Sequence, residues 1–355
     1  FSKRDTKAQP HAVPLTKKHE GTPFPAPYIK ALPSICCCCE NRMQAKVGFH
    51  APPPWRREVL YGCWDAGIRG ASCGTGTEKG LCPFVFHRRD SQWFKEEIML
   101  EIELVNPTEV EKAATIFHQD GFVVVKDALT PEQLEFARQG ATRVIEEQTT
   151  AISLDDANRG FARYSFGPQL HHPEWCQLID LSTVLPIMEK IWGRSDFRCW
   201  GGGGDYSLPG AKIQKLHADI GNEIADPLGR VTMMDLPTPI IVVNFPMVAF
   251  KVINGATRFV RGTHRSREPI PSLDEEPEWM QNSVLCGPAG SAIIRDIRCW
   301  HGGTENRSEE IRPMTSVGYS ASWYNRYREE NLLPRAVYES LSDRAKELTR
   351  LTVEL

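Results

Sequence analysis

Apolar positions recur with the period of an α-helix soon after residue 106. They are Val110, Ala113, Ala114 and Phe117. Thr108 and Glu111 have the three-residue spacing of a capping box, which predicts that the helix begins there. Gly121 is predicted to end the helix, and the uninterrupted apolar run from Phe122 to Val125 is typical of a buried strand.

A second helix is predicted directly after this strand. The segment Thr130-Pro131-Glu132-Gln133 combines a capping hydroxyl, a proline at the first helical position and a side chain that can complete a capping box. The helix is predicted to run from Leu134 to about Glu147. Two helices and a strand are therefore expected to open the folded region.

After about Phe197 the pattern changes to short apolar, β-rich runs separated by clusters of Gly, Pro, Asn or Asp. The runs are Lys212 to Leu216, Ile240 to Phe245, Arg258 to Arg261, Ala292 to Asp296 and Thr315 to Trp323. Because helical patterns do not alternate with these runs, we predict a mainly β fold with flanking helices, built on a double-stranded β-helix of the jelly-roll, cupin-like kind. This domain is predicted to span residues 101–335, followed by a C-terminal helix over 336–355.

The first hundred residues carry a different pattern. Nine prolines within the first 54 residues interrupt any helix, and the glycine-rich stretch Ala71 to Gly80 has neither a helical nor a strand period. We predict an irregular, Pro/Gly/Cys-rich and poorly ordered extension over 1–100. Cys36 to Cys39 form an unbroken row; a zinc site that uses Cys36 and Cys39 is an open alternative, and free thiols in a reducing compartment are favoured.

Composition narrows the function classes only by exclusion. A net charge of -3 in 355 residues gives no general attraction to nucleic acid or to an anionic membrane. The most apolar stretch, Ile240 to Phe250, is too short to cross a bilayer and is interrupted by Pro246. We therefore expect a cytoplasmic protein whose partner is a small-molecule substrate, with a homodimer left open.

Three residues in the β-rich region have the pattern of a metal site. His217 and Asp219 are two positions apart, so on a strand both side chains point to the same face. His301, on a distant strand, would complete a set of two histidines and one carboxylate, which is typical of non-haem iron(II) oxygenases. A lone His-x-Asp triplet is weak evidence, and the strength of this prediction comes from a further residue downstream.

That residue is Arg312, which lies eleven positions after His301. A fixed guanidinium can bind a carboxylate through two parallel hydrogen bonds, as the distal end of 2-oxoglutarate would require. Iron(II), with 2-oxoglutarate and dioxygen as cosubstrates, is therefore the predicted cofactor set. By contrast, His264 and the adjacent pair His171-His172 are interpreted as structural or loop residues.

Several segments in this order are similar to those of one protein family. They are Asp120-Gly121-Phe122, Gln214 to Asp219, Asn254-Gly255-Ala256-Thr257, Gly262-Thr263-His264-Arg265, and His301-Gly302-Gly303 through Arg312-Pro313. From about Asn106 to Arg326 the sequence resembles the phytanoyl-CoA dioxygenase family, particularly fungal members that act on secondary metabolites. The resemblance implies a double-stranded β-helix and assigns 2-oxoglutarate binding to Gln214 and Thr257.

The sequence departs from the family pattern at two places. Arg261 precedes Gly262 where relatives commonly carry proline, and Gly303 stands where some members place a hydroxyl beside the 2-oxoglutarate carboxylate. Neither departure affects the predicted iron ligands. Tyr164 and Trp300 are predicted to line the substrate pocket, which the segment Gly221 to Pro239 is expected to help build.

The predicted reaction is oxidation of a small organic substrate with release of succinate and CO2. Hydroxylation is the default outcome because Asp219 fills the position that is vacant in related halogenases; desaturation, epoxidation and rearrangement use the same iron site. Two alternatives remain. A metal-dependent jelly-roll isomerase or hydrolase would not need Arg312, and a non-catalytic partner subunit would keep the fold without turnover.

Overall fold

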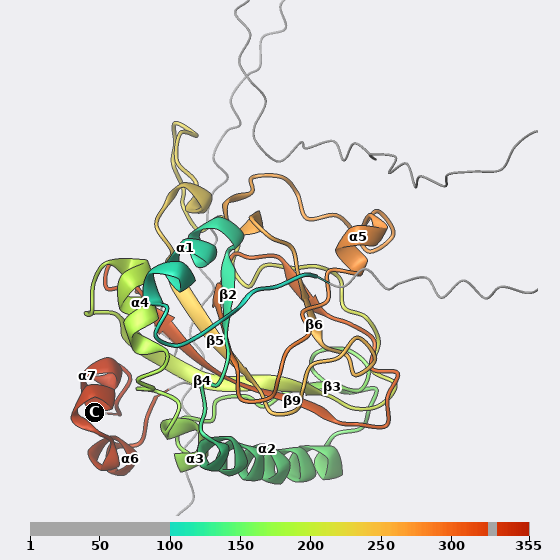
Figure 1. Cartoon of the computed structure of the whole chain (residues 1–355), viewed down its shortest axis with the longest axis horizontal. Coiled ribbons are helices and arrows are strands. Elements are labelled where there is room, and N and C mark those ends of the chain that lie inside the picture. Colours follow the sequence, from blue (N-terminus) through green and yellow to red (C-terminus); the bar gives the residue numbers. More distant parts are fainter. Residues whose placement is uncertain (1–99, 326–331, 355) are drawn as a thin grey trace, which may run out of the picture. The chain divides into compact units, whose positions relative to one another are not determined.

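The computed structural model describes residues 100–325 and 332–354, and its arrangement is shown in Figure 1. The helices are α1 (Val110–Asp120), α2 (Pro131–Ala151), α3 (Pro173–Cys176), α4 (Leu185–Trp192), α5 (Glu278–Gln281), α6 (Arg335–Ser340) and α7 (Asp343–Thr349), with 3-10 turns η1 (Met233–Asp235) and η2 (Thr263–Arg265). The strands are β1 (Leu104–Val105), β2 (Phe122–Val125), β3 (Arg163–Ser165), β4 (Arg198–Ser207), β5 (Ile240–Pro246), β6 (Thr257–Phe259), β7 (Ala292–Asp296), β8 (His301–Gly303) and β9 (Arg312–Ser320).

Within the described residues these strands form two sheets. The large sheet has seven strands in the order β1-β2-β7-β5-β9-β4-β3, and the small sheet consists of β6 and β8. All pairings are antiparallel except that of β1 with β2. In this part of the chain the sheets dominate and helices flank them, which confirms the sheet-dominated fold with flanking helices predicted from the sequence.

The two faces of the large sheet have different environments, because successive strand residues point to opposite sides. On β5, Ile241, Val243 and Phe245 join a core cluster with residues of α1, α2 and α4. Ile240 and Val242, on the other face, line a cavity instead. Helices therefore cover one face, as Figure 1 shows for α2 beneath β4 and β9, and the other face is left for a site.

Local signals in the sequence were confirmed at two helix boundaries. Thr130 and Gln133 form both hydrogen bonds of a capping box at the start of α2, and Pro131 is its first residue. Gly121 ends α1 with φ 86°, a left-handed conformation that favours glycine. The capping box predicted at Thr108 was wrong: the cap residue is Glu109, whose carboxylate accepts from the Asn106 N–H and side-chain amide.

One strand prediction was wrong, and one strand was not among those predicted. Lys212 to Leu216 is not a strand; its backbone contacts β8 only at separate points, including Gln214 N–H to the Gly303 carbonyl at 2.9 Å. Conversely, β4 is the longest strand described, although Gly201 to Gly204 carry no side chains. Glycine has low strand propensity, so β4 depends on its pairing with β9 along its whole length.

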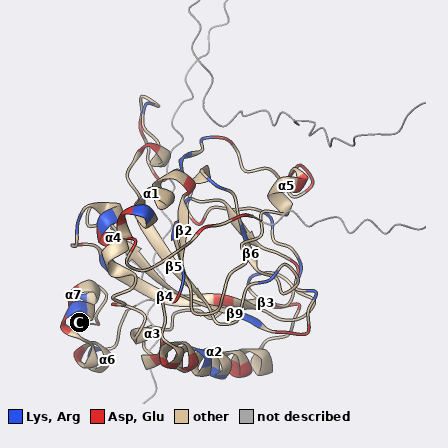
Figure 2. Ribbon diagram, in the orientation of Figure 1, with Lys and Arg blue, Asp and Glu red and all other residues tan. Residues whose placement is uncertain are grey.

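At the C-terminal end, α6 and α7 occupy part of the segment for which a single helix over 336–355 was predicted. The predicted extension over 1–100 and its cysteine row lie outside the described residues, save for Leu100. No helix in residues 100–325 and 332–354 is both long and apolar enough to cross a membrane. Basic and acidic residues both occur along α2 (Figure 2), in keeping with the small net charge.

Candidate functional site

His217, Asp219 and His301 meet on the side of the cavity formed by the small sheet. His301 begins β8, and His217 exchanges backbone hydrogen bonds with it at 2.9 Å in both directions. The Asp219 N–H donates to the Ile297 carbonyl at 3.1 Å, which fixes the carboxylate next to both rings. One ligand atom from each of the three residues lies within 4.8 Å of the others, so the set could hold a metal ion.

Both histidines are oriented through the ring nitrogen that faces away from this cluster. His301 Nδ1 lies 2.9 Å from the Cys299 carbonyl and His217 Nδ1 lies 3.2 Å from the Lys215 carbonyl. A carbonyl can only accept, so each Nδ1 carries a proton, and Nε2 is the ring atom that each histidine turns towards the cluster. Burial, together with the Arg295 cation, lowers the pKa of His301 to about 3, which keeps this ring neutral at ordinary pH.

Asp219 is held as a carboxylate. Burial by itself would raise its pKa, but the Arg295 cation, which also donates a hydrogen bond to it, outweighs that effect and brings the pKa well below its usual range. Arg295 Nη2 donates to Asp219 Oδ2 at 2.7 Å. Two imidazole nitrogens and one anionic carboxylate are the donors that suit non-haem iron(II).

The opposite wall of the cavity carries two buried arginines. Arg312, on β9, is completely buried; its Nη1 donates to Asp205 Oδ1 at 2.9 Å, and its Nε and Nη2 have no hydrogen-bond partner among the described residues. Arg163, on β3, donates from Nη2 to the Thr304 carbonyl at 2.7 Å, and its Nε and Nη1 are likewise without a partner in the described chain. Such buried donors are costly to leave unpaired, which points to an anionic ligand.

The charges of these groups influence one another. Burial and the nearby Arg312 lower the pKa of Arg163 to about 10, so its guanidinium remains charged. For Asp205, burial raises the pKa, but Arg312 and Arg163 outweigh burial and lower it overall. One carboxylate thus faces two buried cations, and a second anion would balance the charge of these two buried arginines.

A cavity of about 570 Å³ lies between the metal-ligand set and these arginines. One end is polar; its residues include Arg163, Asp205, Gln214, Thr257 and Arg312. The other end is mostly apolar; its residues include Trp200, Ile240, Val242 and Ile297. The strand wall between them is bare backbone at Gly201 to Gly204.

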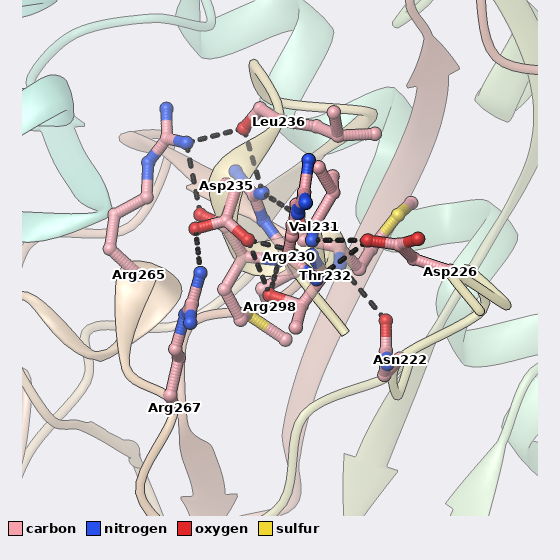
Figure 3. Close-up of polar contacts among 12 residues, drawn as sticks. Asn222, Asp226, Arg230, Val231, Thr232, Asp235, Leu236, Arg265, Arg267 and Arg298 are labelled. Atoms are coloured by element: carbon pink, nitrogen blue, oxygen red, sulfur yellow. Dashed lines mark hydrogen bonds and ion pairs between the residues drawn. The ribbon is translucent and has the colours of Figure 1, made fainter. Parts of the chain in front are cut away.

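The 221–239 segment adjoins the apolar end. Its Met233 packs with Ile240, Val242 and Ile297 in one cluster. Figure 3 shows how arginines from the body of the domain hold this segment: Arg298 donates to the carbonyls of Met233 (2.7 Å) and Leu236 (3.0 Å). No residue of the segment lines the cavity itself, so it supports the apolar end from behind and does not form the pocket wall that the sequence had predicted.

Gln214 and Thr257 both line the polar end. The Gln214 side-chain oxygen accepts from the Gly303 N–H and its nitrogen donates to the Arg159 carbonyl, each at 2.9 Å. Thr257 lies opposite Gly303 in the β6–β8 pairing and is 5% exposed. Gln214 thus ties the metal-ligand segment to β8 at the polar end.

Tyr164 and Trp300 do not line the cavity, which corrects their assignment to the substrate pocket. The Tyr164 hydroxyl donates to the carbonyls of Ile152 and Ser153, and its ring stacks on Tyr206 in the helix-facing core. Trp300 packs in a separate buried cluster. Both directly adjoin a cavity residue in sequence, and neighbours on a strand point to opposite faces.

Asp205 and Arg295 were not singled out from the sequence, and Arg163 was not assigned to the 2-oxoglutarate end of the site. A signal for Arg163 exists at Gly303, because a Cβ there would lie 2.4 Å from the Arg163 guanidinium. Glycine in place of the hydroxyl residue of some relatives thus makes room for a second arginine. Asp205 and Arg295 are recognisable only once the register of β4 and β7 is known.

A sheet-dominated fold with two histidines and a carboxylate gathered at one cavity is typical of non-haem iron oxygenases. Residues 117–314 match the family model described as "Phytanoyl-CoA dioxygenase (PhyH)". That match covers more than half of the sequence, and the chain belongs to the phytanoyl-CoA dioxygenase family. It is accordingly a 2-oxoglutarate-dependent dioxygenase that uses iron.

Two individual relatives, both dioxygenases, agree with this assignment. The chain is 25% identical to dioxygenase trt7 of Aspergillus terreus over 266 residues, which cover 70% of this chain and 86% of that protein. It is 30% identical to dioxygenase olcK of Penicillium canescens over 277 residues, covering 70% and 82% respectively. Among solved structures, the non-haem α-ketoglutarate-dependent epimerase SnoN from nogalamycin biosynthesis aligns at 18% identity with a TM-score of 0.48, over 61% of this chain and 84% of that one.

Proposed function

We propose that the chain oxidises a small organic molecule, a secondary metabolite, with His217, Asp219 and His301 as iron ligands and Arg312 as the anchor of 2-oxoglutarate. Hydroxylation is the proposed default outcome. The observation that carries the proposal is how two groups face each other across one cavity. On one side lie two imidazoles and a carboxylate; on the other lies a buried guanidinium with two N–H donors that have no partner among the described residues. Neither half alone would specify this chemistry.

The residues of this cavity fit both iron(II) and 2-oxoglutarate. The three metal donors are of the types that iron(II) oxygenases use, and each imidazole presents Nε2 towards Asp219 at 3.7 or 3.8 Å. At the polar end, the Nε and Nη2 atoms of Arg312 form the fork that a carboxylate matches. We propose that Arg163, Gln214 and Thr257 surround the same carboxylate.

When bound, iron and 2-oxoglutarate supply the activation of dioxygen, and 2-oxoglutarate is converted to succinate and CO2. The protein's own contributions are positional. The Cys299 and Lys215 carbonyls hold the two ring protons at Nδ1, so the metal-facing nitrogens stay free. Buried Arg312 fixes one end of the cosubstrate, which determines where its keto-acid end can reach.

The substrate is proposed to bind at the apolar end, beside Trp200, Ile240 and Ile297. Apolar walls favour a carbon skeleton over a strongly charged molecule. This environment and the sequence resemblance to fungal members of the family support a secondary metabolite.

We further propose that the two sheets are the halves of a double-stranded β-helix. The large sheet and the β6–β8 sheet both contribute residues to one cavity. Isolated bridges at His217–His301, Phe250–Gly287 and Asn254–Asn306 extend the small sheet beyond its two strands. This arrangement supports the jelly-roll core expected from the sequence.

The test is anaerobic reconstitution of the full chain with iron(II) and 2-oxoglutarate, followed by admission of air. We expect a weak visible charge-transfer band and then succinate in proportion to the enzyme. The His301→Ala variant, which removes one proposed ligand, should show neither. Absence of both the band and succinate from the unmodified chain would refute the proposal and favour a partner-subunit role. Succinate formation that is unchanged in Arg312→Ala would refute the role of Arg312.

A further inference from the structure

Arg295 links the large sheet to the metal-ligand set on the opposite side of the cavity. It lies on β7, and its side chain is 8% exposed. Its Nε donates to Asn244 Oδ1 on the neighbouring strand β5 at 3.0 Å, and its Nη2 donates to Asp219 Oδ2 at 2.7 Å. The planar guanidinium is therefore fixed by Asn244 through Nε, and it fixes the Asp219 carboxylate through Nη2.

Asp219 needs this support more than the two histidines do. His301 belongs to β8 and His217 is bridged to it through the backbone, whereas Asp219 lies just beyond, where regular pairing has ended. Its backbone N–H makes a single hydrogen bond, to the Ile297 carbonyl. The rotation of its side chain is set by Arg295, which supplies the only hydrogen bond to the carboxylate found among the described residues.

The contact selects between the two carboxylate oxygens. Oδ2 accepts from Arg295 and lies 3.7 Å from His301 Nε2, while Oδ1 lies 3.8 Å from His217 Nε2 and has no hydrogen-bond donor within the described part of the chain. A charge-assisted hydrogen bond is about twice as strong as a neutral one, so Oδ2 is the more firmly engaged atom. Oδ1 is the oxygen left available for a metal.

We propose that Arg295 is a positioning residue that makes Asp219 a single-oxygen ligand and keeps it in the orientation that iron(II) requires. The inference rests on the proposed function of this site. A carboxylate freed from Arg295 could turn, or offer both oxygens and occupy a position that the cosubstrate or dioxygen needs. The expected loss is therefore one of metal affinity and of coordination geometry, as found for partners of metal ligands in general.

A nearby ion pair provides a matched control. Arg298 is also completely buried and pairs with Asp296 at 2.6 and 2.9 Å, but its remaining donor, Nη1, binds the Met233 and Leu236 carbonyls. Among the described residues, its side chain makes no hydrogen bond or ion pair to any of the three metal-ligand residues. Replacing Arg298 should cost stability in the same way as replacing Arg295, without a change at the metal.

The experiment compares Arg295→Met, Arg295→Lys, Asn244→Ala and Arg298→Met with the unmodified chain. Iron(II) affinity is measured anaerobically by competition with a chelating dye, and cobalt(II) is substituted so that its visible spectrum reports coordination number. Thermal unfolding of the metal-free proteins gives the stability of each variant. Lysine keeps the charge but cannot bridge Asn244 and Asp219 as the fork does, so it separates charge from geometry.

Arg295→Met is expected to bind iron(II) about 10–100-fold more weakly and to change the cobalt spectrum. Arg295→Lys and Asn244→Ala should show smaller losses in the same direction, and Arg298→Met should bind metal within about twofold of the unmodified chain. If Arg295→Met keeps the parental affinity and cobalt spectrum, or if Arg298→Met matches its loss, the positioning role is wrong. If the unmodified chain itself fails to bind iron(II), the proposed function fails as well, and the two failures are thus distinguished.

Discussion

Replacing Arg312 by methionine tests the cosubstrate site most directly. The substitution keeps a long apolar side chain in the fully buried position and removes the two donors, Nε and Nη2, that have no partner within the described residues. Hydrogen bonds to charged groups contribute about 1.5–3 kcal/mol each, so a bidentate carboxylate contact amounts to at least about 3 kcal/mol. At 1.4 kcal/mol per factor of ten, 2-oxoglutarate affinity should fall by roughly 100-fold or more.

The assay is an anaerobic titration of the iron-loaded protein with 2-oxoglutarate, followed by the charge-transfer band. Asp205 loses its hydrogen-bonded partner in this variant, but Arg163 still lies near it, so folding is checked by thermal unfolding. Arg312→Lys retains one point charge and should lose less affinity. Iron affinity should be unchanged in both variants. A fall in 2-oxoglutarate affinity of less than about tenfold in the methionine variant would refute the assignment.

Three further outcomes are expected. Gly303→Ala places a Cβ 2.4 Å from the Arg163 guanidinium, so the KM for 2-oxoglutarate should rise while iron affinity is retained; an unchanged KM would argue against Arg163 at that site. Gly318→Ala places a Cβ 2.5 Å from the Trp200 ring, and should alter product distribution or substrate KM without shifting the 2-oxoglutarate titration. Burial lowers the pKa of His264 from 6.5 to about 4; because the folded value is the lower one, stability falls as pH drops through this window, by about 2 kcal/mol between pH 7.5 and 5. Denaturant unfolding at both pH values should show that His264→Gln loses less free energy of unfolding between pH 7.5 and 5 than the unmodified chain does.

The iron-ligand prediction could be made from the sequence because it depends on residue types and order. His217 and Asp219 are close in sequence, and a partner histidine followed by an arginine is sufficient to suggest the chemistry even without knowledge of the strand pairing. The metal-ligand geometry did not require Lys212 to Leu216 to be a strand: a single backbone bridge between His217 and His301 brings the set together.

Other parts of the site depend on which face of a strand each residue occupies. Tyr164 was favoured for the pocket, whereas its neighbour Arg163 faces the cavity, because a shift of one residue exchanges the two faces. The role of Arg295 could not be predicted from the sequence. It depends on β7 pairing with β5 and on Arg295 reaching Asp219 across the cavity. Such relations come from long-range pairing, which a local pattern does not contain.

The glycine run of β4 limits how this enzyme could acquire a new substrate range. A Cβ on Gly203 would lie 2.3 Å from the Gly167 carbonyl oxygen, and one on Gly204 would lie 2.0 Å from the Met314 carbonyl oxygen. Both clashes are with backbone, which cannot move aside as a flexible side chain can. Larger side chains at Gly203 and Gly204 are therefore not tolerated, in natural evolution or in directed evolution. Mutant libraries should instead vary Ile240, Val242 and Ile297, whose side chains already shape the apolar end.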